Sequence, residues 1–225
     1  MTVGEVHNMF RTYAQQQGMQ TVRAILPEDI DIYVNTQIVN KVRSVVLENT
    51  MTSFNDKVSI QRNAISPINA IRTLYETKQI TNISGDGKRL TPYNVNIDFD
   101  EEVMFYTGVV VYYPTNKSYS CRLIEGESLE DTMNDYCNAS AWDAPIADIR
   151  HKNSTMIVDI YTDNSNRMPN SVGIRFIKKP AKIKFSENGQ SDVHPDVPEH
   201  IMPDIILTAV NEFFKSVGST SHNSN

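Results

Sequence analysis

The sequence predicts an α+β protein in which a helical bundle carries an inserted β-rich domain. Three observations predict it. Apolar residues recur at helical spacing at the beginning of the chain, β-branched and aromatic residues dominate its middle, and helical spacing returns near its end. We expect the C-terminal helix to pack on three N-terminal helices, so that the β-rich segment forms an insertion whose two ends lie close together.

The chain has 225 residues, enough for one good core or for two smaller lobes that share one. Residues 1–89 are expected to form the helical part of the bundle, and residues 90–185 the inserted β-rich domain. Residues 186–216 then complete the bundle with a loop and a helix. Residues 217–225 are small and polar, and they are predicted to form a flexible tail because they lack apolar surface.

The first helix is predicted from a capping box, with Thr2 as the cap and Glu5 three residues later. The apolar residues that follow at helical spacing are Val3, Val6, Phe10 and Tyr13. Gly18 ends this helix, and residues 19–25 form an extended connector.

A second, longer helix is predicted to begin at Pro27, with Glu28 and Asp29 in its first turn, where acids favour the helix dipole. Its apolar stripe consists of Ile30, Val34, Ile38, Val42 and Val45, widened by Ile32, Val39 and Val46. The width of the stripe indicates that the helix contacts neighbours on two sides. Since β-branched residues are weak helix formers, a strand over residues 38–47 remains an alternative.

A third helix is predicted after a polar, irregular stretch over residues 49–63. It begins at Ile65-Ser66-Pro67 and runs through Ile68, Ile71 and Leu74. From Thr77 the residues change in character, and turn signals follow at Gly85 and Gly87.

The β-rich block is clearest from Val103 to Tyr113, which is dense in β-branched and aromatic residues and predicts a buried strand. Residues 114–117 form a turn, and residues 119–124 are expected to return as the second strand of a hairpin. A short helix is predicted over residues 128–135, and a strand over residues 156–161 followed by a turn at residues 163–166.

The last strand is predicted from the alternation of Val172, Ile174 and Phe176. Pro180 interrupts it because proline cannot donate to a sheet ladder. Residues 181–185 then resume the alternation, with Lys182 and Lys184 on the face opposite Ile183.

The C-terminal helix is the strongest in the sequence. Pro198 or Pro203 suits its first turn, and Glu199 and Asp204 lie near the positive end of its dipole. Its apolar stripe consists of Met202, Ile205, Ile206, Ala209, Val210, Phe213 and Val217. Gly218 is placed to end it.

This C-terminal region also carries a resemblance. Ile-Arg-Phe-Ile-Lys-Lys-Pro at 174–180 precedes Val-Pro-Glu-His-Ile-Met-Pro-Asp-Ile-Ile at 197–206 and Ala-Val at 209–210. This succession resembles the ring or connector proteins of crAss-like phages and, more distantly, the head-to-tail adaptors of short-tailed phages. The amino-acid pattern is similar from Val172 onward, and the order of secondary-structure elements is similar over the whole chain.

The resemblance implies a virion structural protein that forms a closed ring of about twelve copies in the phage neck. Such a ring joins the portal protein to the tail, contacts the adjacent ring proteins of the tail and lines the channel through which DNA passes without sequence-specific binding. It is assembled in the host cytoplasm, and no enzyme activity and no cofactor are implied. Contacts with other copies or partners are expected at Arg175, Lys178, Lys179, Pro180, Glu199, His200, Phe213 and Phe214.

The charge of the chain fits this expectation. A net charge of −6 argues against a dedicated nucleic-acid binder, which would present a basic face. The lysines at 178, 179, 182 and 184 are more typical of a solvated face or a partner contact than of a DNA patch. An acidic channel wall lets DNA slide, because its phosphates find no positive charge to hold them.

Catalytic motifs are missing from the sequence: it has no Gly-rich phosphate loop, no Gly-x-Ser-x-Gly elbow and no cysteine with a nearby histidine. The best metal-like cluster is His194, Glu199 and His200, with Asp192 and Asp204 nearby. These residues equally suit a helix start, so no metal is predicted. A metal-assisted hydrolase that uses the cluster is the enzyme alternative.

Two further groups of side chains have a structural and a functional interpretation. Asp98, Asp100, Glu101 and Glu102 form an acidic run that lacks the glycine and distal glutamate of an EF-hand, so we expect a solvated turn or a subunit contact. A carbohydrate- or ligand-binding β-module is the alternative function, with Trp142 and the tyrosines as a stacking platform. Tyr106, Tyr112, Tyr113 and Tyr119 are better explained as cross-strand core pairs.

The totals exclude several classes of protein. No apolar run approaches the ~20 residues of a membrane span, and the first residues lack the features of a secretory signal. Cys121 and Cys137 are too few for a disulfide framework and do not match a metal spacing. We therefore expect intracellular synthesis with reduced thiols.

Overall fold

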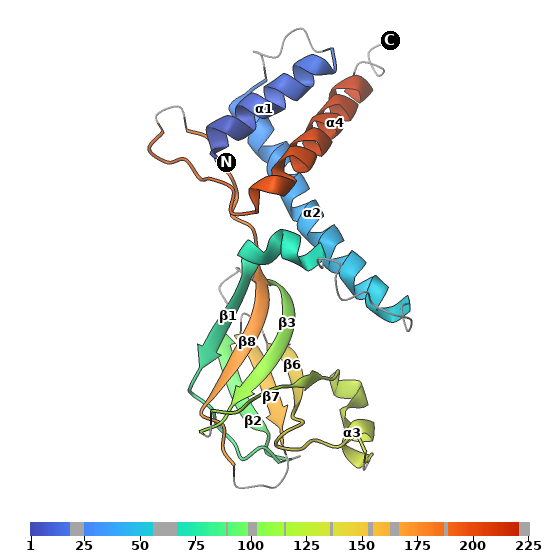
Figure 1. Cartoon of the computed structure of the whole chain (residues 1–225), viewed down its shortest axis with the longest axis vertical. Coiled ribbons are helices and arrows are strands. Elements are labelled where there is room, and N and C mark those ends of the chain that lie inside the picture. The colour runs from blue at the N-terminus through green and yellow to red at the C-terminus, as the bar shows by residue number, and fades with distance from the viewer. Residues whose placement is uncertain are drawn as a thin grey trace. The chain divides into compact units, whose positions relative to one another are not determined.

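The computed structural model describes residues 1–18, 25–55, 67–88, 90–98, 103–114, 116–135, 137–152, 155–162, 167–186 and 189–220. These residues contain four α-helices and eight strands in two sheets. The chain divides into two compact units (Figure 1), with Met1–Leu74 and Pro180–Asn225 in unit 1 and Tyr75–Lys179 in unit 2. Unit 2 is therefore an insertion in unit 1 that begins at Tyr75 and ends at Lys179. The sequence analysis had predicted the inserted β-rich domain over residues 90–185.

The described part of unit 1 contains three α-helices that pack on one another: α1 (Val3–Gln16), α2 (Pro27–Asn55) and α4 (Met202–Thr220). The predicted capping box of α1 is confirmed. The Glu5 N–H donates to Thr2 Oγ1 at 3.3 Å, and the Thr2 N–H donates to Glu5 Oε2 at 2.7 Å.

The helices meet at the aromatic ring of Phe213 on α4. It packs edge-on against Phe10 of α1, with ring centroids 5.9 Å apart, and against Tyr33 of α2 at 5.4 Å. The predicted apolar stripe of α2, from Ile30 to Val45, is buried in the same core. Helical periodicity therefore identified the inner faces of α2 and α4.

The prediction of three N-terminal helices in a four-helix bundle is wrong. In place of the third helix lies a 3-10 helix, η2 (Pro67–Leu74), which is interrupted by non-helical angles at Ile71. Ile71 and Leu74 are fully buried, so the apolar signal was genuine. It marks a short 3-10 segment, because the non-helical backbone angles at Ile71 interrupt the helix before β1 begins at Tyr75.

The segment that returns to unit 1 is held by two polar side chains of α2, one helical turn apart. Asn35 accepts the Ile183 N–H at 2.8 Å and donates to the Ile183 carbonyl at 3.0 Å. Asp31 accepts the Phe185 N–H at 3.0 Å. Ile183 is consequently buried while Lys182 and Lys184 are exposed, as the alternation predicted. The segment is not a second strand; its pairing is an isolated bridge between Lys184 and Val193.

Asp31 also ties α1 to α2. Its Oδ1 lies 2.8 Å from Nε2 of His7 on α1, and both residues are buried. The His7 ring stacks on Phe185, with centroids 4.8 Å apart. A single carboxylate therefore connects α1, α2 and the returning segment.

The C-terminal helix begins with a 3-10 turn, η3 (Glu199–Ile201), and continues as α4 to Thr220. Residues 217–220, predicted to belong to a flexible tail, are thus helical. Residues 221–225 lie outside the described residues, as do most of the predicted connector at 19–25, the start of the predicted third helix and the turn at 163–166. Residues 99–102 of the acidic run also lie outside them.

Unit 2 consists of two four-stranded sheets with the orders β1-β8-β3-β4 and β2-β7-β6-β5. The first sheet contains β1 (Tyr75–Ile80), β8 (Ser171–Lys178), β3 (Val103–Tyr112) and β4 (Ser118–Ser120). The second contains β2 (Tyr93–Asp98), β7 (Thr155–Tyr161), β6 (Ile146–Lys152) and β5 (Arg122–Leu123). All neighbours pair antiparallel except β5 and β6, which are parallel.

One core fills the space between the two sheets, built mainly of β-branched residues such as Val109, Val158 and Ile174. The predicted strands at 103–113, 156–161 and 172–177 are confirmed. The predicted hairpin partner at 119–124 is confirmed only at its start, because β4 pairs with β3 whereas β5 pairs with β6 in the other sheet. The short predicted helix is also confirmed as α3 (Gly126–Asn134), which has no buried residue. The sequence analysis missed β1, β2 and β6.

The fold of unit 1 predicts a large loss of stability when Asp31 is replaced. Asp31→Ala leaves the Phe185 N–H and His7 without their buried acceptor, and we expect it to lower the free energy of unfolding by about 3 kcal/mol. Asp29→Ala, in the same turn of α2, is the control and should cost less than about 1 kcal/mol. Urea unfolding followed by circular dichroism measures both; equal losses would contradict the role given to Asp31.

Gly85 provides the matching test in unit 2. It has a φ of +103°, and a Cβ there would lie 2.0 Å from the carbonyl oxygen of Pro92. Gly85→Ala should therefore destabilise unit 2 by about 2–4 kcal/mol. At Gly108 a Cβ meets nothing within 4 Å, so Gly108→Ala should be nearly neutral. The fluorescence of Trp142, the only tryptophan, follows the unfolding of unit 2.

Candidate functional site

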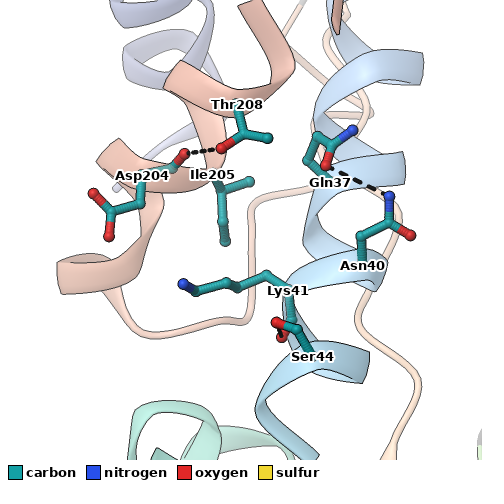
Figure 2. A pocket seen from close by; sticks show the side chains of 7 residues that line it. All are labelled: Gln37, Asn40, Lys41, Ser44, Asp204, Ile205 and Thr208. Carbon is teal, nitrogen blue, oxygen red and sulfur yellow. Dashed lines mark hydrogen bonds between the residues drawn. The ribbon is translucent and has the colours of Figure 1, made fainter. Parts of the chain in front are cut away.

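A shallow pocket of about 230 Å³ lies between α2 and α4 within unit 1 (Figure 2). Its lining consists of Gln37, Asn40, Lys41 and Ser44 from α2 and Asp204, Ile205 and Thr208 from α4. The four α2 residues share one helix face because they are three or four positions apart. That polar spacing was present in the sequence, but the sequence analysis used only the apolar stripes of this helix.

The main group available for binding in this pocket is the ammonium group of Lys41. The hydroxyl groups of Ser44 and Thr208 donate to carbonyl oxygens of their own helices, at 2.9 and 2.8 Å. Lys41 makes no ion pair with a described residue, and its side chain extends into the space between the helices, while the carboxylate of Asp204 points away (Figure 2). The arrangement suits a single carboxylate or amide side chain, and the volume is below that of usual cofactor pockets.

Unit 2 has a second pocket of about 350 Å³, lined in part by Arg122, Asp135 and Asn138. The charges of Arg122 and Asp135 are used in local hydrogen bonds. Arg122 donates to the side chain and carbonyl of Asn138, and Asp135 accepts from the Asn138 amide and the Cys137 N–H. These two hydrogen bonds, the one from Asn138 first, lower the pKa of Asp135. The pocket therefore stabilises the loop after α3.

Two buried acids lie opposite each other on β6 and β7. Asp159 is fully buried, accepts from Asn94 of β2 at 2.7 Å and forms an ion pair with Arg150. Asp148, its cross-strand partner, lies 3.6 Å from the same arginine. Burial first, and then Asp148, raises the pKa of Tyr161 beside them. This group holds three strands of one sheet together, and its acids were not singled out from the sequence.

Of the partner contacts predicted around β8, Arg175 and Lys178 lie on the strand, Lys179 follows it as the last residue of unit 2, and Pro180 belongs to unit 1. Arg175 and Lys179 are exposed, and Lys178 is half-buried with its Nζ 3.4 Å from Glu76 Oε1 on β1. Pro180 is buried. Pro180 therefore offers little surface to another molecule, and Lys178 already has a neighbour in its own sheet.

The residues of the predicted helix start lie near the N-terminus of the chain. Glu199 Oε2 is 3.8 Å from the Met1 amino group, and His194 Nδ1 accepts the Val3 N–H at 3.3 Å. His200 is exposed. Among the described residues there is no group of three or more His, Cys, Asp or Glu side chains placed to hold a metal ion. Glu199 and His194 instead contact the first residues of the chain at the start of α1.

The two phenylalanines predicted as contacts differ in position. Phe213 is 8% exposed and belongs to the core where α1, α2 and α4 meet. Phe214 is half-buried, with its ring centroid 6.3 Å from that of Phe213. Only Phe214 has surface left for a partner.

The aromatic group considered as a sugar platform is already covered. The Trp142 ring packs edge-on against Tyr113 and Tyr119, at 6.2 and 5.3 Å. The guanidinium of Arg167 lies over the indole ring, 4.1 Å from its centroid, and the Lys117 ammonium lies 5.6 Å away. A sugar ring would have to displace a cation–π contact to stack there.

Comparisons with known protein families and curated proteins identify no relative of this chain. No protein-family model matches the chain, and no curated protein is significantly similar to it. Within the described residues, no helix has the length and apolar character needed to cross a membrane.

The two cysteines should differ sharply in reactivity. Cys121 is buried, which raises the pKa of its thiol to about 12, whereas Cys137 is exposed. Because the thiolate is the reactive form, iodoacetamide at about pH 8 should modify Cys137 in the folded protein and Cys121 only after unfolding. Mass spectrometry measures the modification, with Cys137→Ser as the control. Equal labelling of both thiols in the folded chain would contradict the burial of Cys121.

Proposed function

We propose that this chain is a structural protein of a tailed-phage virion that assembles into a closed ring in the neck. The ring joins the portal protein to the tail, contacts adjacent tail rings and surrounds the channel through which DNA passes. Copies associate side by side, about twelve to a ring, matching the symmetry of the portal. The protein acts by its geometry and carries out no covalent chemistry.

The observation that carries the proposal is the apolar surface of unit 1. Ile32 and Leu47 on α2 are 62% and 57% exposed, and Leu207 and Val217 on α4 are 44% and 46% exposed. These side chains leave apolar area exposed on two long helices, and a neighbouring copy that covers it gains hydrophobic stabilisation. The resemblance of residues 174–210 to phage ring proteins names the class of assembly.

The charge of the chain supports the same function. A protein with a net charge of −6 repels the phosphates of DNA on average, which favours passage over binding. The small polar pocket between α2 and α4 adds no reactive pair of side chains to this surface. The ammonium group of Lys41, which forms no ion pair with a described residue, suits a contact with an acidic side chain of a partner.

The proposal is tested by the mass of the purified chain, measured by light scattering over a range of concentrations, together with negative-stain images. We expect closed rings with a central hole, formed either alone or after addition of a portal protein of the same phage. The measurement with added portal protein is needed because ring formation can require the portal as a template. A chain that stays monomeric at every concentration, with the portal present and absent, would contradict the proposed function.

A further inference from the structure

The outer side of α2 carries a second stripe, formed by Ile32, Thr36, Val39 and Arg43. These residues are four, three and four positions apart, which is the spacing of helices that pack side by side. Ile32 is 62% exposed, Thr36 and Arg43 are exposed, and Val39 is half-buried. We call these residues the outer stripe of α2.

The outer side of α4 has a stripe of the same kind, formed by Asp204, Leu207, Asn211 and Phe214. Asp204 also lines the pocket between α2 and α4, but its carboxylate points out of that pocket (Figure 2). The spacing of the four residues is three, four and three, so this stripe spans ten positions where the α2 stripe spans eleven. Leu207 is 44% exposed, Asp204 and Asn211 are exposed, and Phe214 is half-buried. We call these residues the outer stripe of α4.

The two outer stripes match in one antiparallel register. It sets Arg43 opposite Asp204, Val39 opposite Leu207, Thr36 opposite Asn211, and Ile32 opposite Phe214. This register pairs one positive with one negative side chain, forms two apolar pairs and forms one polar pair. A parallel alignment would place Asp204 against Ile32 and leave a carboxylate on an apolar side chain, which disfavours it.

The polar positions have bonding capacity left for these pairs. Arg43 and Asp204 form no ion pair with any residue that the structure describes. The Thr36 hydroxyl donates to the Ile32 carbonyl at 2.8 Å, so its oxygen can still accept a hydrogen bond. Asn211 Oδ1 accepts from Gln17 at 2.9 Å, and its amide group can donate to that oxygen.

The outer stripes cannot meet within one chain. α2 and α4 pack on each other through their buried faces, and each outer stripe lies on the face of its helix turned away from that contact. A contact between them joins two copies head to tail, and repetition of such a contact produces a ring if the rotation closes and a filament if it does not.

We propose that the outer stripe of α2 in one copy docks antiparallel on the outer stripe of α4 in the next copy. This inference rests on the proposed function, since it names the contact by which the ring forms. The partner is a second copy of this chain, because the complementary charge, polar and apolar positions are all found on the chain itself.

The decisive experiment mixes two full-length variants that are each blocked on one stripe. Ile32→Asp removes the α2 contact and Leu207→Asp the α4 contact. Each alone should lose at least about a hundredfold in self-association, because a carboxylate would be buried against apolar side chains. An equimolar mixture should form a heterodimer that stops at two copies, since one intact stripe of each kind remains. Light scattering measures the masses.

A charge exchange tests the register. Arg43→Asp or Asp204→Arg alone should weaken association about tenfold, and the two together in one chain should restore most of it. Leu123→Asp is the control, because it introduces the same charge at a residue 43% exposed in unit 2, outside both stripes. Circular dichroism confirms that every variant is folded.

The outcomes separate this contact from the proposed function. Rings that persist in both blocked variants would overturn the contact and leave the ring standing, as would a mixture that forms no heterodimer. Open filaments of the unmodified chain, abolished by either block, would support the contact and contradict the closed ring. A monomer with and without the portal would overturn both.

Discussion

The buried carboxylate of Asp31 is the constraint on which unit 1 depends. It accepts hydrogen bonds from α1 through His7 and from the returning segment through the Phe185 N–H. A buried carboxylate without partners costs several kcal/mol, so these donors must be in place whenever the unit is folded. Asn35, one turn later, repeats the arrangement with Ile183. The direction from which the chain approaches α4 follows from these bonds.

Elements whose signal was local and periodic were predictable from the sequence. The capping box of Thr2 and Glu5, the inner faces of α2 and α4, and the strand at 103–113 all obey patterns that neighbouring residues determine. β2 shows the limit: Tyr93, Val95 and Ile97 alternate inward, but asparagines between them read as turns. η2 shows another, since the apolar spacing of its residues does not reveal the non-helical backbone angles at Ile71 that interrupt it.

The candidate site was less predictable, because burial depends on what the rest of the chain covers. Phe213 and Pro180 were expected at a contact and proved to be buried, while Glu199 and His194 hold the N-terminus. Asp148 and Asp159 are meaningful only once β6 and β7 are paired. The width of the apolar stripe on α2 was the informative signal. It indicated neighbours on two sides, and Ile32 on the second side is exposed.

The insertion of unit 2 has a consequence for synthesis on the ribosome. α1 and α2 emerge before unit 2, whereas Phe185 and α4, which complete the surroundings of Asp31 and the inner face of α2, emerge after it. Unit 2 is continuous in sequence and can fold while the early helices are still incomplete, since domains fold as units during synthesis. During that interval the apolar stripes of α2 are uncovered on both sides. The nascent chain is therefore most prone to aggregation before its last segment appears.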